Sequence, residues 1–203
     1  MMKQDTMKKL TLVLAILFGL AVRSQATVTI DVTQVGGDVV FTTSGSLDLT
    51  GATLFTTSGS GFGLGFISDA PNWYVGTGSG TAYDSYALTS YAASFGTSGT
   101  YYSSPSSSTG DNFFIWGNNG FDPRQVGVAA GYVSGASISS VMTFNAATIG
   151  GLFMTEGVYS YELPGDSIIL TIGTVSSVPD SGFTVGLLGF ALIGLSAIRR
   201  QIR

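Results

Sequence analysis

The chain has no cysteine and no histidine among its 203 residues. Without these ligands, zinc, copper and haem sites of the usual kind cannot form. A serine–histidine–aspartate triad and a cysteine–histidine pair are excluded for the same reason. Because disulfides are impossible, stability must come from hydrogen-bonded structure and an apolar core, even if the protein is exported.

Positive charge is almost absent from the middle of the chain. Between Thr27 and Ser177 there are ten acidic residues and one base, Arg124, so this region carries a net charge of −9. Without a lysine there, a serine–lysine dyad cannot be built. Such a surface repels nucleic acid and anionic lipid, and we expect no nucleic-acid partner.

Long helical patterns are missing except for two apolar segments, one at each end of the chain. At the N-terminus, three lysines precede the thirteen-residue apolar run Leu10–Val22, and small residues surround a cleavage point after Ala26. This order is typical of a secretory signal peptide. We therefore expect signal peptidase to remove residues 1–26. An uncleaved N-terminal anchor is the alternative.

The last segment, residues 178–203, has three parts in fixed order: a short polar motif, an uncharged apolar run at Phe183–Ile198, and a basic end. The motif consists of Val178, Pro179, Asp180, Ser181 and Gly182, and the basic end contains Arg199, Arg200 and Arg203. A helix over the sixteen apolar residues would be about 24 Å long. That nearly spans a bilayer core, so we expect a transmembrane helix at about 183–198 with the arginines in the cytoplasm. A buried core helix is the alternative.

This order of parts resembles the PEP-CTERM class of bacterial sorting signals, in the variant whose signature begins VPDSG. The resemblance implies that an exosortase, a membrane-embedded cysteine peptidase or transpeptidase, processes the tail. It also implies an inner-membrane intermediate held in lipid by the C-terminal helix, followed by release to the cell surface or extracellular matrix. Pro179 disfavours helix at Val178 and should keep the motif extended for the enzyme.

Residues 27–177 are expected to form one β-rich extracytoplasmic domain, with an all-β fold and an antiparallel β-sandwich architecture. The expected strands are Thr27–Val35, Val39–Thr43, Leu47–Leu49, Thr53–Phe55, Asp111–Trp116, Val126–Val133, Ala136–Phe144, Val158–Leu163 and Ser167–Thr174. Turn-forming residues at 36–38, 117–123 and 164–166 separate some of these strands. Residues 147–154 suggest one short helical turn.

Two segments of this domain lack a clear alternation of polar and apolar residues. The Gly-, Ser- and Tyr-rich segment Gly76–Gly110 fits either a long loop or irregular short strands. The hexamer FTTSGS occurs twice, at Phe41–Ser46 and Phe55–Ser60. Two copies are too few for a repeat protein, so we interpret them as equivalent strand ends with Ser-Gly turns.

The end of the domain resembles many uncharacterised PEP-CTERM cargo proteins. The resemblance lies in a GYVSG element at Gly131–Gly135, a G-x-Y-x-Y strand at Gly157–Tyr161 and a final strand at Asp166–Gly173. It implies a β-rich extracellular domain and no known activity.

Three sets of residues are candidates for chemistry or binding. Glu156 and Glu162 are the only pair considered for glycoside hydrolysis, which needs two carboxylates. Asp111, Asn118, Asn119 and Asp122 are the polar cluster considered for calcium. Trp73, Tyr74 and Trp116 are aromatic candidates for contact with a sugar or a partner protein.

The leading hypothesis is a non-enzymatic envelope, cell-surface or extracellular-matrix protein without cofactors or metals. Its partners are signal peptidase, exosortase and membrane lipid. The alternative is a carbohydrate-binding surface module that carries the same tail and binds extracellular polysaccharide.

Overall fold

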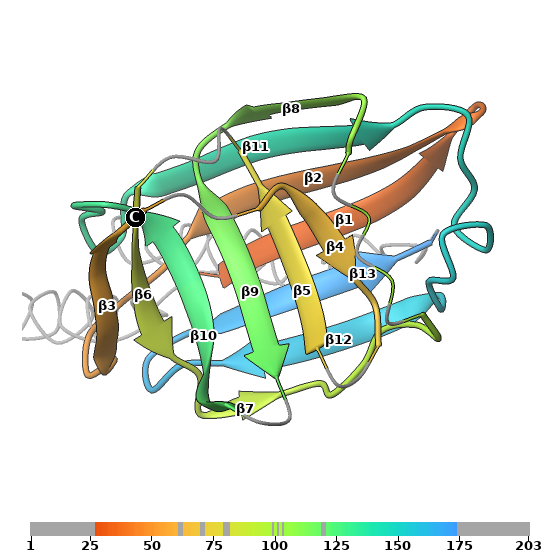
Figure 1. Cartoon of the computed structure of the whole chain (residues 1–203). Helices are drawn as coiled ribbons and strands as arrows, with labels where there is room; N and C mark the ends of the chain where they lie inside the picture. The colour runs from red at the N-terminus through yellow and green to blue at the C-terminus, as the bar shows by residue number, and fades with distance from the viewer. Residues whose placement is uncertain are drawn as a thin grey trace, which may run out of the picture. The chain divides into compact units, whose positions relative to one another are not determined.

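The computed structural model describes residues 27–60, 63–69, 72–78, 82–98, 100, 102, 104–118 and 121–173. All regular secondary structure in these residues is β-strand (Figure 1). The strands are β1 (Thr27–Val35), β2 (Asp38–Ser46), β3 (Leu54–Gly59), β4 (Gly65–Ile67), β5 (Asn72–Thr77), β6 (Tyr83–Ala87), β7 (Ser90–Tyr91), β8 (Ser107–Gly110), β9 (Phe113–Asn118), β10 (Phe121–Ala129), β11 (Ser137–Phe144), β12 (Gly157–Glu162) and β13 (Ser167–Ile172). The prediction of an all-β domain is confirmed.

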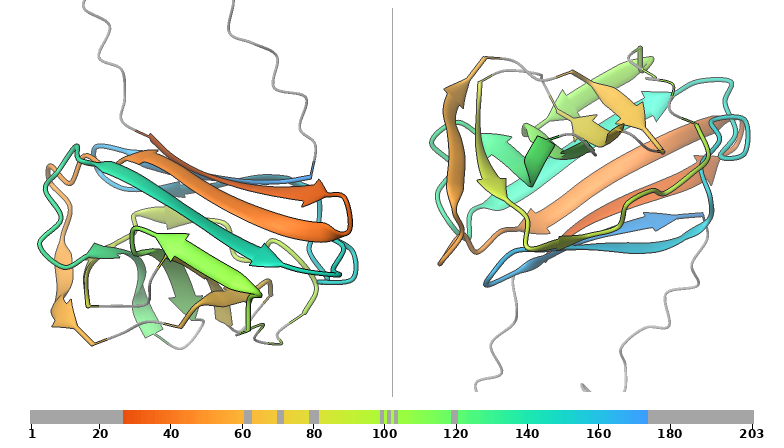
Figure 2. Two further views of the ribbon diagram at one scale, coloured as in Figure 1. Left: turned by 90° about the horizontal axis from the view of Figure 1, so that it is seen from above. Right: turned by 60° about the horizontal axis from the view of Figure 1, so that its bottom comes forward.

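The strands form two sheets that face each other in two layers (Figure 2). One sheet has seven strands in the order β7-β12-β13-β1-β2-β11-β8, and the other has six in the order β3-β6-β10-β9-β5-β4. Within the described ranges, no helix has the length and apolar character needed to cross a bilayer.

The N-terminal hairpin is the clearest success of the sequence pattern. β1 pairs with β2 up to Val35 and Asp38, around the two glycines between them. Gly36 has a φ of 61°, in the left-handed region that glycine adopts without strain. Along most of both strands, buried residues alternate with partly buried or exposed ones, so one face of the hairpin lies on the core.

One pairing departs from the predicted antiparallel arrangement. β1 pairs in parallel with β13, from Thr27 opposite Ser167 to Val32 opposite Ile172. The first and last strands of the domain therefore lie side by side in the middle of the seven-stranded sheet (Figure 1). No local pattern marks this pairing, because it joins segments from the two ends of the domain.

The predicted strand at Leu47–Leu49 is wrong. These residues connect β2 to β3 in the other sheet. Their backbone amides donate to side-chain hydroxyls instead of to a neighbouring strand. The Leu47 amide donates to the Tyr132 hydroxyl over 2.9 Å, and the Leu49 amide donates to Ser134 Oγ over 2.8 Å. Backbone amides satisfied in this way do not require a β-ladder.

The turn predicted at Asp122-Pro123 is also wrong, because both residues lie within β10. The register of β10 against β9 shifts between Phe121 and Gln125. Proline donates no amide hydrogen and is tolerated in a strand at such irregularities. The structure thus places the proline in the irregular stretch before the regular pairing starts at Gln125.

The segment Gly76–Gly110 contains irregular short strands, one of the two alternatives left open by its composition. Between β7 and β8, Phe95 is buried at 1 % exposure, and its amide donates to the Ser68 carbonyl over 2.9 Å. At 147–154 the expected helical turn is a set of turns without a helix. Its one i to i−4 bond runs from the Leu152 amide to the Thr148 carbonyl over 2.9 Å.

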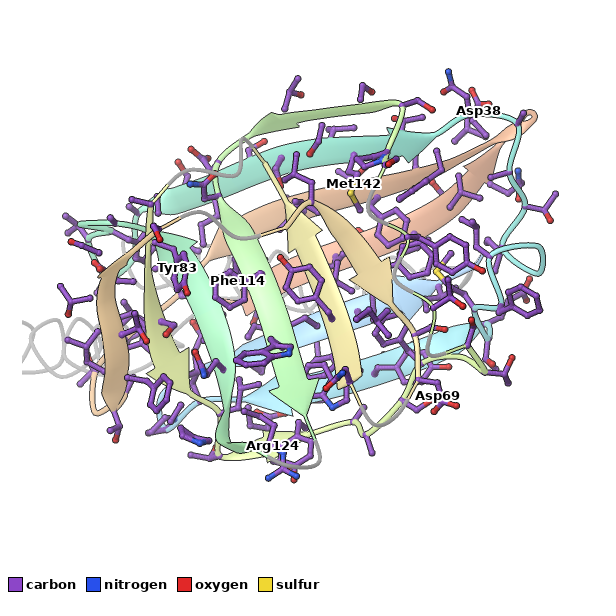
Figure 3. All side chains as sticks on the ribbon, in the orientation of Figure 1. Asp38, Asp69, Tyr83, Phe114, Arg124 and Met142 are labelled. Carbon is purple, nitrogen blue, oxygen red and sulfur yellow. The ribbon has the colours of Figure 1, made fainter. Side chains whose placement is uncertain are left out.

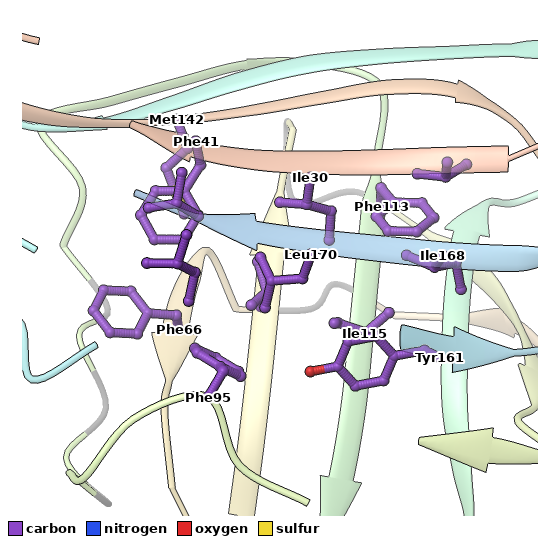
Figure 4. Packing of buried hydrophobic residues seen from close by; sticks show 14 of the residues in the cluster. Ile30, Phe41, Phe66, Phe95, Phe113, Ile115, Met142, Tyr161, Ile168 and Leu170 are labelled. Atoms are coloured by element: carbon purple, nitrogen blue, oxygen red, sulfur yellow. The ribbon is translucent and has the colours of Figure 1, made fainter. Parts of the chain in front are cut away.

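The apolar core fills the space between the sheets (Figure 4). Ile30, Ile168 and Leu170 from the seven-stranded sheet lie opposite Phe113 and Ile115 from the six-stranded sheet (Figure 4). All five are fully buried, so apolar packing between the two sheets stabilises the domain.

A small group of hydroxyls links the two sheets inside this core. Thr77 Oγ1, on β5, lies 3.2 Å from Thr43 Oγ1 on β2 and 2.7 Å from Ser140 Oγ on β11. All three side chains are buried. The contacts fix the position of one sheet relative to the other, because each hydroxyl would otherwise lose its water without a replacement.

Candidate functional site

The predicted sorting and export signals lie outside the described residues. At the N-terminus these are the signal peptide and its cleavage point at Ala26. At the C-terminus they are the helix at about 183–198, every residue of the sorting motif and the three arginines of the basic end: Val178, Pro179, Asp180, Ser181, Gly182, Arg199, Arg200 and Arg203. The structure therefore gives no geometry for these residues, and the predicted boundaries stay predictions.

Within the described residues, the most distinctive surface is the outer face of the six-stranded sheet, which we call the aromatic face. Along β5, Trp73 and Val75 point into the core, so Tyr74 between them lies on the opposite side of the sheet. On β9, Phe113 and Ile115 belong to the core, which places Phe114 and Trp116 on this outer face.

Two lines of directly opposed residues cross the aromatic face. The first places Tyr74 opposite Trp116 and Trp116 opposite Gln125. The second runs from Gly76 through Phe114 to Gly127. Opposed residues on neighbouring strands are within side-chain reach, so these lines bring residues from β5, β9 and β10 together.

Glycines on this face give the aromatic rings room to lie along the sheet. A Cβ atom at Gly127 would be 1.9 Å from Phe114 Cε1, and one at Gly76 would be 2.1 Å from the Tyr74 hydroxyl. The Tyr74 hydroxyl donates to the Gly63 carbonyl. The rings are therefore held by backbone rather than by flexible side chains.

Tyr83 of β6 extends the aromatic face beyond Phe114. The two rings meet edge to face with centroids 4.9 Å apart, and Figure 3 shows both on the side of the sheet turned to the viewer. Tyr74 reaches Phe114 from the other side, at 6.1 Å. Phe114 is only 3 % exposed, so it supports the face, whereas Tyr83 and Trp116 are half-buried and keep ring surface open to solvent.

The polar groups of this face are uncharged. Gln125 is opposite Trp116, and Asn72 precedes Tyr74 on the same side of β5. Asn72 Oδ1 is buried and has no hydrogen-bond partner within the described part of the chain. An amide that lacks a partner beside aromatic rings is a candidate for recognition of hydroxyl groups.

Of the three predicted aromatic candidates, Tyr74 and Trp116 lie together on the aromatic face, whereas Trp73 lies in the core. Trp73 is 2 % exposed and packs between Tyr91 and Tyr161, with ring centroids at 5.9 Å and 5.0 Å. A buried indole cannot stack on a sugar or a partner, so the prediction for Trp73 is wrong. Trp73 and Tyr74 are adjacent in β5, and adjacent side chains of a strand point to opposite faces of the sheet.

Arg124 is the one basic residue between Thr27 and Ser177. It lies beside the buried aromatic group of Trp73 and Tyr91. Its guanidinium carbon is 4.6 Å from the centroid of the Tyr91 ring, which in turn stacks on Trp73. The contact is a cation–π interaction. It gives the arginine a structural role beside the core.

The two carboxylates considered for glycoside hydrolysis are not brought together. Glu156 precedes β12 and Glu162 ends it. Six residues of strand separate their backbones by roughly 20 Å, well beyond the carboxylate spacing of such enzymes. The Glu162 carboxylate instead accepts a hydrogen bond from the Ser160 hydroxyl.

The polar cluster considered for calcium is also separated. Asp111 lies before β9 and Asn118 at its end, which puts them roughly 20 Å apart along the strand. Asp111 Oδ2 accepts a hydrogen bond from the Ser139 amide over 2.9 Å. Among the described residues, no group of three or more acidic side chains is placed to hold a metal ion. Asn119 lies outside those residues.

Tyr83, Phe114 and Gln125 were not identified from the sequence. β9 and β10, which hold Phe114 and Gln125, are buried on both sides in places, so alternation of polar and apolar residues does not show which side each residue faces. The glycines at 76 and 127 were the available signal, since glycine within a strand often marks a close approach to a neighbour.

Comparison with known families identifies the C-terminal segment. The VPDSG-CTERM motif family matches residues 177–202. This segment is a C-terminal sorting signal. The match contains the whole predicted motif, including Asp180 and Ser181 at its centre, and it indicates an exported protein directed to the cell surface. No curated protein and no solved structure matches the chain.

Proposed function

We propose that this protein is a non-enzymatic component of the bacterial cell surface or extracellular matrix, and that an exosortase sorts it through its VPDSG tail. The observation that carries the proposal is the match of the sorting-signal family to residues 177–202. Export through residues 1–26, and a transient inner-membrane intermediate held by the helix at about 183–198, belong to the same proposal.

Chemistry of the tail supports this order of events. Arg199, Arg200 and Arg203 favour a cytoplasmic C-terminus, which puts the motif at the opposite side of the membrane. Pro179 keeps Val178 out of the helix, so the backbone of the motif stays extended and accessible to a peptidase. The enzyme and signal peptidase are the proposed partners, together with the lipid around the helix.

The domain supports a role that needs no reaction. The chain lacks histidine and cysteine, and the two carboxylates that could have served a glycosidase lie at opposite ends of β12. The domain instead offers a compact β-structure with an aromatic face. A passive role in the envelope, without a cofactor, fits these features best.

Sorting is tested by substitution within the motif. Pro179→Ala/Asp180→Ala should leave export and insertion intact and should block release, so that unprocessed chain accumulates in the inner membrane. Val175→Ala/Ser176→Ala changes two residues just before the motif and is the matched control, which should be processed like the wild type. Membrane fractionation, immunoblotting and mass spectrometry of the mature C-terminus measure these outcomes. If the motif variant loses its tail and reaches the wild-type fraction, the tail is only an anchor.

Export is tested independently at the other end of the chain. Sequencing the amino terminus of the mature protein should give Thr27 as the first residue. A start at Met1 or Met2 would show that the N-terminal segment stays attached as an anchor.

A further inference from the structure

We propose that the aromatic face of the six-stranded sheet binds an uncharged polysaccharide. The proposal goes beyond sorting and does not rest on it, because the face belongs to the folded domain and the sorting signal to the tail. It also replaces the aromatic set expected from the sequence, since Trp73 is in the core and Tyr83 lies on the face.

Two half-buried rings provide the stacking surface. Trp116 and Tyr83 lie on either side of Phe114 on the outer side of the sheet. Aromatic rings expose an apolar π-surface that packs against the C–H face of a sugar ring. Phe114, at 3 % exposure, fills the space between the two half-buried rings.

The distance between the two rings favours a chain of sugars over a single sugar. On the neighbouring strand β10, Trp116 is opposite Gln125 and Tyr83 is opposite Ala129. These two positions are four residues apart, or roughly 13 Å along the strand. A polymer that touches both rings must therefore lie extended across the face.

Amide groups beside Trp116 provide hydrogen bonds. Gln125, which is 4 % exposed, lies directly opposite Trp116, and Asn72 lies on the same side of β5 as Tyr74. Asn72 Oδ1 is buried and lacks a partner among the described residues, so a ligand hydroxyl can donate to it once the Asn72 amide turns outward. An amide both donates and accepts, as sugar hydroxyls do.

Charge selects the class of polymer. The residues of the two lines that cross the face, from Tyr74 to Gln125 and from Gly76 to Gly127, are all uncharged. The domain around them carries a net charge of −9 between Thr27 and Ser177. These surroundings repel an anionic polysaccharide or a nucleic acid, whereas they do not repel an uncharged polymer.

Backbone support makes the site preorganised. The Phe114 ring lies over Gly127, and the Tyr83 ring lies over Gly59, where a Cβ atom would be 2.5 Å from Tyr83 Cζ. Rings fixed in this way lose little conformational freedom when a ligand binds.

Affinity electrophoresis of the full-length chain tests the proposal. The native gels contain dextran, laminarin, glucomannan or galactomannan, with alginate as the anionic reference, and the detergent has a headgroup without sugar. We expect at least one uncharged polymer, and not alginate, to retard the protein. Trp116→Ala should weaken that binding roughly tenfold or more, as expected for an aromatic hot spot.

Tyr83→Ala provides a second variant in case Trp116→Ala perturbs folding, and it should weaken binding in the same gels. Phe153→Ala is the matched control, because Phe153 is a 52 % exposed aromatic side chain in the connection between β11 and β12 and is not part of the aromatic face. Circular dichroism shows whether each variant is folded. Absence of retardation in every uncharged polymer overturns the proposal, as does equal binding by alginate or full binding by both folded face variants.

Discussion

The buried hydroxyl of Tyr161 gives a sharp test of the packing between the two sheets. Its side chain is fully buried against Trp73, and its hydroxyl has no hydrogen-bond partner among the described residues. Burial raises the pKa of this hydroxyl far above its usual value, because the interior cannot solvate the phenolate. The group is therefore a cost to the fold that Tyr161→Phe would remove.

The expected change in the free energy of unfolding follows from the cost of burying a hydroxyl without a hydrogen-bond partner. Leaving a hydroxyl unsatisfied costs about 1–3 kcal/mol, whereas the phenylalanine ring preserves the contact with Trp73. Tyr161→Phe should therefore raise the free energy of unfolding by up to about 3 kcal/mol. For a domain of this size, each kcal/mol shifts Tm by about 2–4 °C.

Tyr132→Phe is the matched control, since it removes a hydroxyl that is well bonded. The Tyr132 hydroxyl accepts from the Leu47 amide at 2.9 Å and donates to the Ala136 carbonyl at 2.5 Å. Its loss leaves the Leu47 amide without this acceptor, so the variant should be destabilised by about 1–3 kcal/mol. The two substitutions delete the same atom and should move Tm in opposite directions.

Thermal unfolding of the full-length protein, followed by near-ultraviolet circular dichroism, measures both shifts under identical conditions. An unsatisfied Tyr161 hydroxyl is refuted if Tyr161→Phe lowers Tm by as much as Tyr132→Phe. That result would mean that the Tyr161 hydroxyl is bonded in solution, for example to a buried water molecule.

Three further changes test other parts of the structure. Thr77→Val should lower the free energy of unfolding by about 1–3 kcal/mol, because the buried hydroxyls of Thr43 and Ser140 lose their shared partner. Urea unfolding measures this change, and an unchanged free energy would contradict the link between the sheets. Gly127→Ala should destabilise the domain by about 1–3 kcal/mol through displacement of the Phe114 ring, and this cost should largely vanish in a Phe114→Ala background. Burial raises the pKa of Asp31, so its contribution favours the fold below the usual aspartate pKa and is lost as pH rises through the higher folded value. Asp31→Asn should accordingly flatten that decline in a Tm series across mildly acidic pH, and an unchanged slope would contradict the assignment.

The two FTTSGS hexamers show where local sequence stops being informative. Phe41, in the first copy, is fully buried in β2, whereas Phe55, in the second copy, is 52 % exposed in β3. β2 is an inner strand of the seven-stranded sheet, and β3 is an edge strand of the other sheet. Identical residues therefore have different environments, and the predicted equivalence of the two copies is wrong.

The aromatic candidates show the same limit for the site. Composition identified Trp73, Tyr74 and Trp116 as a set, but strand parity divides them between the core and the outer face. Tyr83 and Gln125 join the face only because β6, β10 and β9 are neighbours in the sheet. A single sequence does not reveal this order, since it depends on long-range pairing.

The sequence by itself determined the sorting motif, the all-β class and the strands whose patterns are local. Those features depend on short segments, such as Val178–Gly182 or the hairpin of β1 and β2, whose chemistry is complete within a few residues. Only the tertiary structure decided the parallel pairing of β1 with β13, the burial of Trp73 and the composition of the aromatic face. Each of these depends on which strands become neighbours, and strand neighbours are selected by packing across the whole domain rather than by local propensity.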